Sequence, residues 1–131
     1  MFFALQSKDV ERESWWVRPL LEEFDRLTDS ADPDDVLDAA KKAESQLWGY
    51  YDGTFRGVVA TQIRNSRKGA MLLVWVCYGI DAKGLLASCY AEIENWAREK
   101  GCKRVQIVGR EGWERVLPGF KRKAVVLEKR L

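Results

Sequence analysis

Apolar and polar residues alternate with a period that changes along the chain, and each change predicts a boundary between elements. Apolar side chains first recur every three or four positions, which predicts a helix at 15–28 in which Pro19 is tolerated only near the first turn. A second helix is predicted at 33–45, because Asp32 can cap it and proline suits its first position. Residues 2–5 are expected to form a short edge strand.

The period shortens to two further along, as expected for strands. Segments 47–51 and 55–63 predict two strands joined by a tight turn at Asp52-Gly53, since this dipeptide is a strong hairpin signal. A second turn at 65–69 leads into the uncharged segment 71–78, whose β-branched and aromatic residues are typical of a strand buried on both faces. Three successive antiparallel strands are the expected result.

A helix and a parallel strand are predicted next. The turn 79–84 leads into a helix with one apolar face, which Asp81 can cap and Gly101 can end. Residues 103–108 alternate as a strand does, and a strand-helix-strand crossover makes the two strands parallel.

The remaining residues predict a short helix at 110–117 and a basic final strand at 120–131. No linker, repeat or low-complexity tract interrupts the chain. Residues 1–131 are therefore predicted to form one α+β domain with a mixed central sheet, mostly antiparallel, and helices on both faces.

Composition narrows the class of protein. Of the 131 residues, 47% are hydrophobic and 32% are charged, as in globular proteins generally. No apolar run approaches the roughly 20 residues that span a bilayer, so no membrane role is expected. The start of the chain has no basic leader, and a cytoplasmic setting is the default expectation.

The chain has three cysteines without a CxxC pair and no histidine, which suggests neither a disulfide framework nor a metal site. The absence of histidine also excludes serine-histidine and cysteine-histidine nucleophiles. Any proton transfer must then use a carboxylate, tyrosine, lysine, cysteine or water. Helix capping and dipole matching explain the acidic cluster at 29–38.

Charge is unevenly distributed about a net charge of +2. Residues 1–51 carry −6 and residues 52–131 carry +8, so either an anionic ligand is drawn to the second half or the halves form complementary faces of one fold. Basic residues at 121–123 and 129–130 flank the apolar segment 124–127. No recognition motif accompanies them, which favours charged strand ends over a nucleic-acid site.

Several segments, taken in this order, carry a family resemblance. They are the Leu-Trp pair and hairpin within 47–59, the strand 71–78, the helix ending at Gly101 with the strand 104–108, and the closing Gly109-Arg110-Glu111-Gly112-Trp113 with Gly119-Phe120. Over about residues 10–131 the chain resembles the GNAT superfamily of acetyl-coenzyme-A-dependent N-acetyltransferases. In detail it is similar to the small GNAT-like proteins of tailed bacteriophages, which adds the host cytoplasm or a virion to the expected settings.

The resemblance implies a coenzyme site between the fourth and fifth strands, with the pantetheine arm on the fourth strand and the pyrophosphate at the start of the next helix. The residues so implied are Val76, Cys77, Tyr78, Lys83, Gly84 and Leu85. Residues 79–86 lack the leading Gln or Arg and the second Gly or Ala of the family's phosphate turn. Arg115 stands where the family usually has a tyrosine acting as general acid.

Two functions are open at this point. The first is an N-acetyltransferase that takes acetyl from acetyl-CoA to a primary amine, with coenzyme A and an amine acceptor as partners. The second is a non-catalytic GNAT-like protein of a phage virion, or of host interaction, that binds another protein. The departures in the phosphate turn favour the second, with Trp15 or Trp113 as candidates for its binding face.

If the chain is an enzyme, Tyr51 and Tyr78 are the candidate catalytic residues, because they are polar groups expected near the predicted cleft. A structural role at the edge of the sheet is the alternative for both. Glu92 and Glu94 are expected to be solvated on their helix. Cys77 has no evident cationic neighbour to stabilise a thiolate, so a nucleophilic role is not expected.

Overall fold

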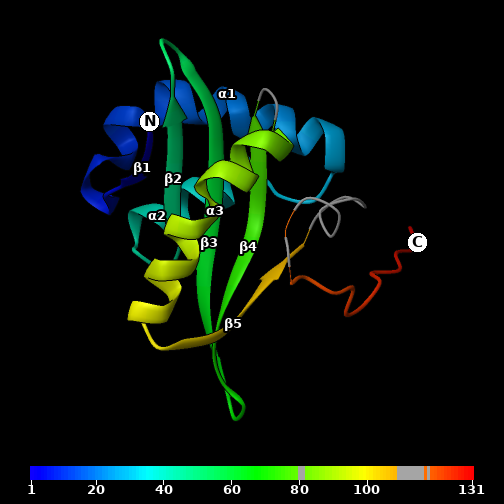
Figure 1. Ribbon diagram of the computed structural model, residues 1–131. Coiled ribbons are helices and arrows are strands. Elements are labelled where there is room, and N and C mark those ends of the chain that lie inside the picture. Colours follow the sequence, from blue (N-terminus) through cyan, green and yellow to red (C-terminus); the bar gives the residue numbers. More distant parts are fainter. Residues whose placement is uncertain (80–81, 109–116, 118) are drawn as a thin grey trace.

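The computed structural model describes residues 1–79, 82–108, 117 and 119–131, with the backbone alone for 82–86 and 88. Figure 1 shows the elements in chain order. They are β1 (Phe2–Leu5), the 3-10 helix η1 (Ser7–Asp9), α1 (Val10–Thr28), α2 (Pro33–Lys41), β2 (Gln46–Tyr51), β3 (Phe55–Ser66), β4 (Gly69–Gly79), α3 (Ala82–Glu99) and β5 (Cys102–Ile107).

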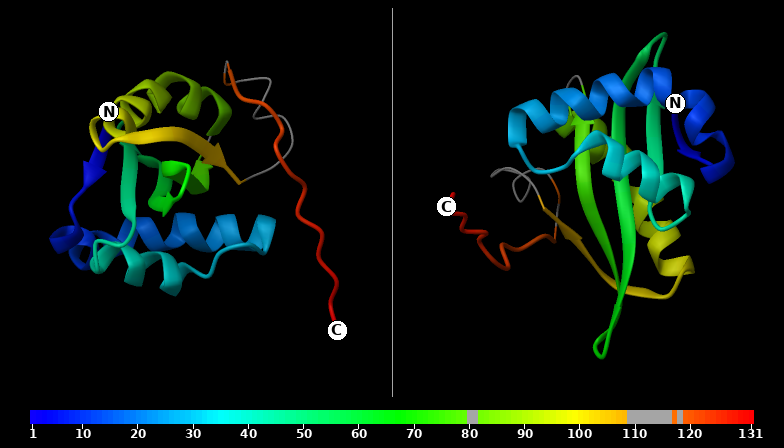
Figure 2. Two further views of the ribbon diagram at one scale, coloured as in Figure 1. Left: turned by 90° about the horizontal axis from the view of Figure 1, so that it is seen from below. Right: turned by 180° about the vertical axis from the view of Figure 1, so that it is seen from behind.

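Five strands form one sheet in the order β1-β2-β3-β4-β5. Neighbouring strands are antiparallel except β4 and β5, which are parallel and connected through α3. Helices α1 and α2 cover one face of the sheet and α3 covers the other (Figure 2). The predicted α+β class, the antiparallel meander, the parallel crossover and the edge strand are therefore confirmed.

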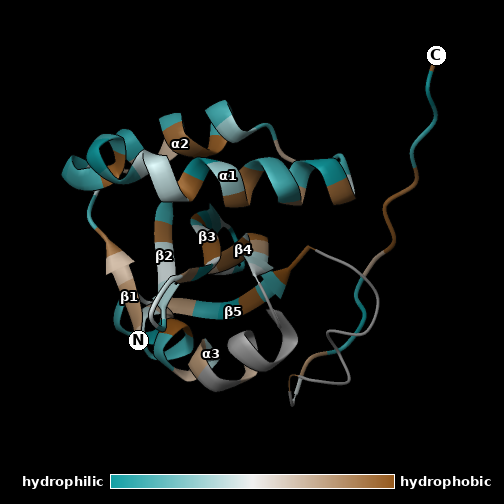
Figure 3. Cartoon of the chain, turned by 90° about the horizontal axis from the view of Figure 1, so that it is seen from above, coloured by the Kyte–Doolittle hydropathy of each residue, from teal (hydrophilic) through white to brown (hydrophobic). Residues whose placement is uncertain are grey.

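Each face of the sheet has its own hydrophobic core. On one face, residues of α1 and α2 such as Leu21 and Leu37 are almost fully buried against the sheet, forming what we call the α1 core. On the other face, Ile93 and Ala97 of α3 pack with the strands in the α3 core. Figure 3 shows how apolar and polar residues alternate along α1, as an amphipathic helix requires. Each fully buried leucine stabilises the fold by about 2 kcal/mol relative to an exposed one.

Local signals set the ends of the helices. The Asp32 carboxylate accepts a hydrogen bond from the backbone N–H of Asp34 at 2.8 Å and caps α2, as predicted. Gly101 follows α3 with φ at 80°, which suits glycine. α2 ends at Lys41, four residues earlier than predicted, and Ala43 then takes a left-handed φ of 58° as the chain turns toward β2.

The prediction for the first helix was wrong in its start and in the place of its proline. α1 begins at Val10, so Pro19 lies in the helix interior and not in the first turn. Val10 and Val17 are fully buried, and this apolar stripe favours a longer helix through packing. Pro19 is on the exposed side, where water can satisfy the carbonyl of Trp15 that lacks its helical donor.

The first hairpin turn has the predicted bounds, and the second is shorter than predicted. The first connects Tyr51 and Phe55, which are paired, through three residues, and the register shifts beside it. The second spans only 67–68, because β3 and β4 pair as far as Ser66 and Gly69. Gly69 there has φ at 103°, a conformation that side chains rarely adopt.

The predicted strand at 120–131 is absent: residues 120–131 form neither helix nor strand. Val126 and Leu127 are 82% and 91% exposed, although the segment has the composition of a strand (Figure 3). Composition alone forms no strand without a partner, and the segment pairs with no described strand. The predicted short helix at 110–117 lies outside the described residues except for Leu117, which is buried.

Close packing at Gly49 leads to a test of the α1 core. A Cβ atom at Gly49 would lie 2.5 Å from Trp16 Cη2 and 2.7 Å from Phe3 Cζ. We expect Gly49→Ala to lower the free energy of unfolding by about 1–3 kcal/mol, because both rings would have to move. The measurement is denaturant unfolding. The control is Gly53→Asn, in a turn with φ at 75° and no atom near the Cβ position, which should change stability by less than about 1 kcal/mol. Equal losses in the two variants would contradict the packing argument.

Candidate active site

β4 contains one residue more than β3 can pair with. Thr61 lies opposite Val74 and Ala60 lies opposite Val76, so Trp75 is the extra residue of a β-bulge. Regular alternation would place Val74 and Val76 on the same face of the sheet. Instead Val74 packs in the α3 core and Val76 in the α1 core. The bulge therefore exchanges the two faces of β4.

The bulge is also where β4 and β5 separate. Their parallel pairing ends at Val74, whose carbonyl accepts a hydrogen bond from the N–H of Val108 at 3.1 Å. β4 continues to Gly79, and on the β5 side residues 75–79 pair with no strand in the described part of the chain. Figure 1 shows the two strands diverging toward their C-terminal ends. We call this divergence, from Trp75 to Gly79 on β4, the β4–β5 fork.

Three of the residues predicted to contact the coenzyme lie together in the β4–β5 fork. Val76 is fully buried in the α1 core, and Tyr78 is half-buried at its margin. Cys77 lies between them and packs on the opposite face, against the α3 core. The side chains thus anchor this part of β4 to both layers, which leaves its backbone as the part able to bind a ligand.

Burial suppresses the chemistry of the Cys77 thiol. Packing against the α3 core raises the pKa of Cys77 to about 12, because the charged thiolate would be desolvated there. At neutral pH the thiol is therefore protonated. The three cysteines are free of disulfides, and Cys89 is buried in α3.

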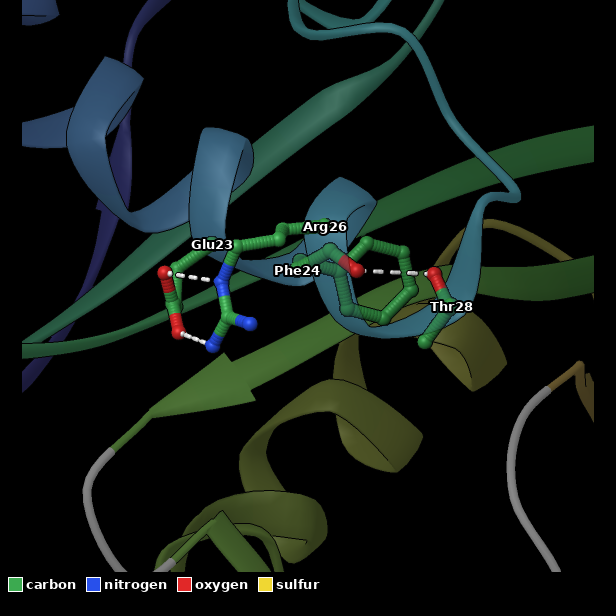
Figure 4. A network of polar contacts seen from close by, with 4 residues as sticks. All are labelled: Glu23, Phe24, Arg26 and Thr28. Carbon is green, nitrogen blue, oxygen red and sulfur yellow. Dashed lines mark hydrogen bonds and ion pairs between the residues drawn. The ribbon is translucent and has the colours of Figure 1, made fainter.

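The last turns of α1 pass beside the end of β4. Arg26 donates hydrogen bonds to the Glu23 carboxylate, and the Thr28 hydroxyl donates to the carbonyl of Phe24 at 2.8 Å (Figure 4). The hydrogen bond to Glu23 is the main cause that raises the pKa of Arg26, and the Tyr78 phenol adds a smaller electrostatic effect. Tyr78 therefore lies within electrostatic range of the Arg26 guanidinium.

Tyr51 lies elsewhere, at the end of β2. Its side chain is 40% exposed and meets the ring of Phe55 edge to face, with the centroids 5.0 Å apart. β3 lies between β2, which carries Tyr51, and β4, which carries Tyr78, so the backbones of these two strands are about 10 Å apart. The structure does not bring the two candidate catalytic tyrosines together.

Three aromatic side chains gather around Phe55, the ring that Tyr51 contacts. Trp16 stacks on Phe55 with a centroid separation of 4.2 Å, and Trp15 meets the same ring edge-on at 5.5 Å. Trp15 is 67% exposed, in line with its prediction as an exposed tryptophan, whereas Trp113 lies outside the described residues. An exposed aromatic surface of Trp15 and Tyr51 results at this end of the sheet.

The predicted pyrophosphate residues Lys83, Gly84 and Leu85 lie in the first turn of α3. The helix begins at Ala82, shortly after β4 ends, so its N-terminus follows the β4–β5 fork directly. The side chains of these residues, and the predicted cap Asp81, lie outside the described part.

A buried polar cluster beside the bulge escaped the sequence analysis. The Ser45 hydroxyl donates to the carbonyl of Thr61 at 2.7 Å and accepts from the indole N–H of Trp75 at 3.2 Å. On the other face, the Thr61 hydroxyl accepts from the indole of Trp48 at 3.1 Å and donates to Gln46 at 2.9 Å. The only signal in the sequence is that these polar residues interrupt apolar strand patterns.

The two carboxylates named on α3 differ in exposure. Glu92 is exposed, as expected, whereas Glu94 is half-buried and accepts a hydrogen bond from Arg98. In the described ranges no three His, Cys, Asp or Glu side chains gather as metal ligands would. Among the same residues, no helix combines the length and apolar character needed to cross a membrane.

The chain is similar to known proteins in its fold and not in its sequence. No family profile and no curated sequence matches the chain. An aminoglycoside acetyltransferase from an uncultured soil metagenomic sample superposes with a TM-score of 0.74 at 10% identity, over 100% of this chain and 95% of that one. The ribosomal-protein-alanine N-acetyltransferase of Brucella melitensis biovar Abortus 2308 gives 0.71 at 14% identity, over 98% and 99%.

A third solved structure, an acetyltransferase of Trypanosoma brucei, gives a TM-score of 0.65 at 18% identity, over 100% of this chain and 99% of that one. At these identities the similarity concerns the course of the backbone. It extends along the whole chain and along nearly the whole of each compared protein. The chain has the fold of the GNAT acetyltransferases.

Proposed function

We propose that the protein is an acetyl-CoA-dependent N-acetyltransferase that acts on a primary amine. The observation that carries the proposal is the β4–β5 fork, where β4 keeps its pairing with β3 but has no described partner on the other side. Unpaired backbone N–H and C=O groups in a sheet interior need partners. The amide groups of a pantetheine arm have the donors and acceptors to supply them.

The residues of the β4–β5 fork fit such a ligand. The backbone from Val76 to Tyr78 can bind the pantetheine amides as another strand would, and Val76 and Cys77 are held rigid by packing into the two cores. The N-terminus of α3 follows, with the positive end of the helix dipole available to a pyrophosphate, and Lys83 belongs to this first turn. Gly84 would let backbone N–H groups approach the phosphates closely.

Acetyl-CoA, when bound, supplies an acetyl group activated as a thioester. The tasks left to the chain are to orient the amine, to remove its proton and to exclude water. Tyr78 lies on β4 within the fork, so its hydroxyl is the first candidate for the group that takes part in proton transfer. Tyr51 is a weaker candidate, because β3 separates it from β4.

The distribution of charge supports a coenzyme site formed by the second half of the chain and an amine site beside the first half. The half of the chain that contains β4, α3 and β5 carries +8, which attracts a polyanionic coenzyme. The half that contains α1 and α2 carries −6, which attracts a cationic amine. Among the compared proteins, one is named for aminoglycosides and one for an alanine of a ribosomal protein. An aminoglycoside and a peptide with a free α-amine are therefore suitable acceptors to test first.

A binding protein without catalysis is the second candidate function. The exposed aromatic surface of Trp15 and Tyr51 favours it, since exposed tryptophan and tyrosine are common at protein interfaces. The phosphate turn that departs from the family pattern favours it as well. The two candidates differ in one measurable property, the affinity for acetyl-CoA.

Thermal unfolding with acetyl-CoA tests the proposal. A ligand at 100 times its dissociation constant stabilises the folded state by about 2.7 kcal/mol, which should raise the midpoint by about 10 °C for a chain of this length. Adenosine 3′,5′-bisphosphate, which lacks the pantetheine arm, is the control and should give a much smaller shift. No shift at millimolar acetyl-CoA would reject the enzyme and leave the binding protein.

Tyrosine variants test the proposed proton transfer. Tyr78→Phe should reduce kcat by about 10²-fold and leave the dissociation constant of acetyl-CoA within about twofold, because only the hydroxyl is lost. Tyr51→Phe is the matched control and should reduce kcat by less than about threefold. The readout is thiol release with the amine acceptors named above. A larger loss in Tyr51→Phe would transfer the role to Tyr51.

The Cys77 thiol should not take part in the reaction. With its pKa raised to about 12 it is protonated at working pH, so Cys77→Ala should retain turnover within about threefold. In the wild type both Cys77 and Cys102 are half-buried and burial raises the pKa of both thiols, but the shift is large at Cys77, so Cys102 should react first with iodoacetamide at pH 8, as followed by mass spectrometry. Loss of turnover in Cys77→Ala, with acetyl-CoA binding retained, would refute this.

A further inference from the structure

The extra residue of β4 is tied to the strand opposite through a single hydroxyl. We infer that Ser45 and Trp75 are positioning residues that hold the bulge in register and so fix the backbone of the β4–β5 fork for coenzyme binding. The role in binding rests on the proposed function, whereas the effect on β4 does not.

The tie consists of two hydrogen bonds in series. Trp75 donates its indole N–H to the Ser45 hydroxyl at 3.2 Å, and that hydroxyl donates to the backbone carbonyl of Thr61 at 2.7 Å. Thr61 is the β3 residue paired with Val74, immediately before the extra residue. The side chain of the bulge is thus connected to the backbone directly across from it. Ser45 is only 4% exposed and Thr61 is fully buried, so water does not compete for these groups.

The register of a bulge needs such a device. A long strand can accommodate its extra residue at any of several neighbouring positions. When the bulge moves along the strand, the side chains between its old and its new position turn to the other face of the sheet. In β4 a shift by one residue toward Gly79 would turn Val76 from the α1 core to the α3 face and move the point at which β4 leaves β5. Only with the bulge at Trp75 does its indole meet the Ser45 hydroxyl.

Hydrogen-bond satisfaction supports the same register. In the described part of the chain no buried side-chain nitrogen or oxygen lacks a partner. If the bulge moved, the half-buried Trp75 indole would lose the Ser45 hydroxyl as its acceptor, and the loss of such a hydrogen bond is unfavourable. The tie therefore selects one register among those that the apolar residues of β4 would allow.

Trp48 offers a matched control. Its indole N–H also donates to a buried hydroxyl, that of Thr61 at 3.1 Å, but Trp48 belongs to β2 and packs on the α3 face. It pairs with Val59, and its hydrogen bond reaches the Thr61 side chain without involving Trp75 or Ser45. Phenylalanine at either position removes one indole hydrogen bond and similar volume, and only at Trp75 does the change release the bulge.

The experiment compares Trp75→Phe with Trp48→Phe in the full chain, with isothermal titration of acetyl-CoA as the readout. We expect Trp75→Phe to weaken binding about tenfold, because loss of a buried hydrogen bond lowers the fraction of protein with the competent β4 register. Trp48→Phe should weaken binding by less than about twofold, with a similar or larger fall in the midpoint of thermal unfolding. Equal weakening in both variants, or wild-type affinity in Trp75→Phe, would overturn the inference.

A second readout needs no ligand and separates this inference from the proposed function. In the ligand-free protein, Trp75→Phe should accelerate amide hydrogen exchange at Val76, Cys77 and Tyr78 more than at Leu72 and Leu73, whereas Trp48→Phe should not. If the wild type fails to bind acetyl-CoA, the proposed function fails and the exchange pattern still decides whether the tie holds β4. Uniform acceleration along β4 would reject the positioning role.

Ser45→Ala provides an independent variant should Trp75→Phe fold poorly. It removes both hydrogen bonds of the tie without changing the volume of the indole site. The affinity loss and the exchange pattern should match those of Trp75→Phe. An affinity and an exchange pattern like those of the wild type would show that the tie positions nothing.

Discussion

The place where β4 stops pairing with β5 determines most of the architecture. β4 forms hydrogen bonds with β3 along its whole length, but it pairs with β5 only from Ala70 to Val74. One extra residue at this point turns the following side chains to the other face and lets the two strands diverge. Val76 can then join the α1 core while its backbone faces the β4–β5 fork. A regular strand would place Val76 on the same face as Val74, in the α3 core, and would give β4 no reason to diverge from β5 at this point.

The two helical layers support β4 from opposite sides, and they do so by different means. α1 supplies a long buried stripe that tolerates an interior proline, since Pro19 faces solvent while Val17 and Leu21 face the sheet. α3 supplies Ile93 and Ala97 to the other core and brings its N-terminus to the end of β4. A backbone held from both sides loses little further entropy when a ligand binds, which favours affinity.

Sequence reasoning predicted the elements better than the site. Local signals such as the Asp32 cap and the Gly101 ending are visible in a few neighbouring residues, and both are correct. The bulge at Trp75 leaves no comparable trace, because it lies inside a continuous apolar segment and depends on Ser45 and Thr61, far away in the sequence. The interior proline and the unpaired C-terminal segment were missed for the same reason: both depend on contacts between distant parts of the chain.

Charge explains why the C-terminal segment leaves the sheet although its composition suits a strand. β5 exposes Lys103 and Arg104, so a strand beginning with the basic residues 121–123 would meet like charges at that edge. The segment instead extends from Phe120, which packs on Tyr90 of α3, to Arg130, which pairs with Asp29 after α1 at 3.1 Å. An exposed pair of this kind adds little stability. It does connect the basic half of the chain to the acidic half, so part of the opposite charge of the two halves is used in an ion pair within the protein. Only the remaining basic residues would then be available to an anionic coenzyme.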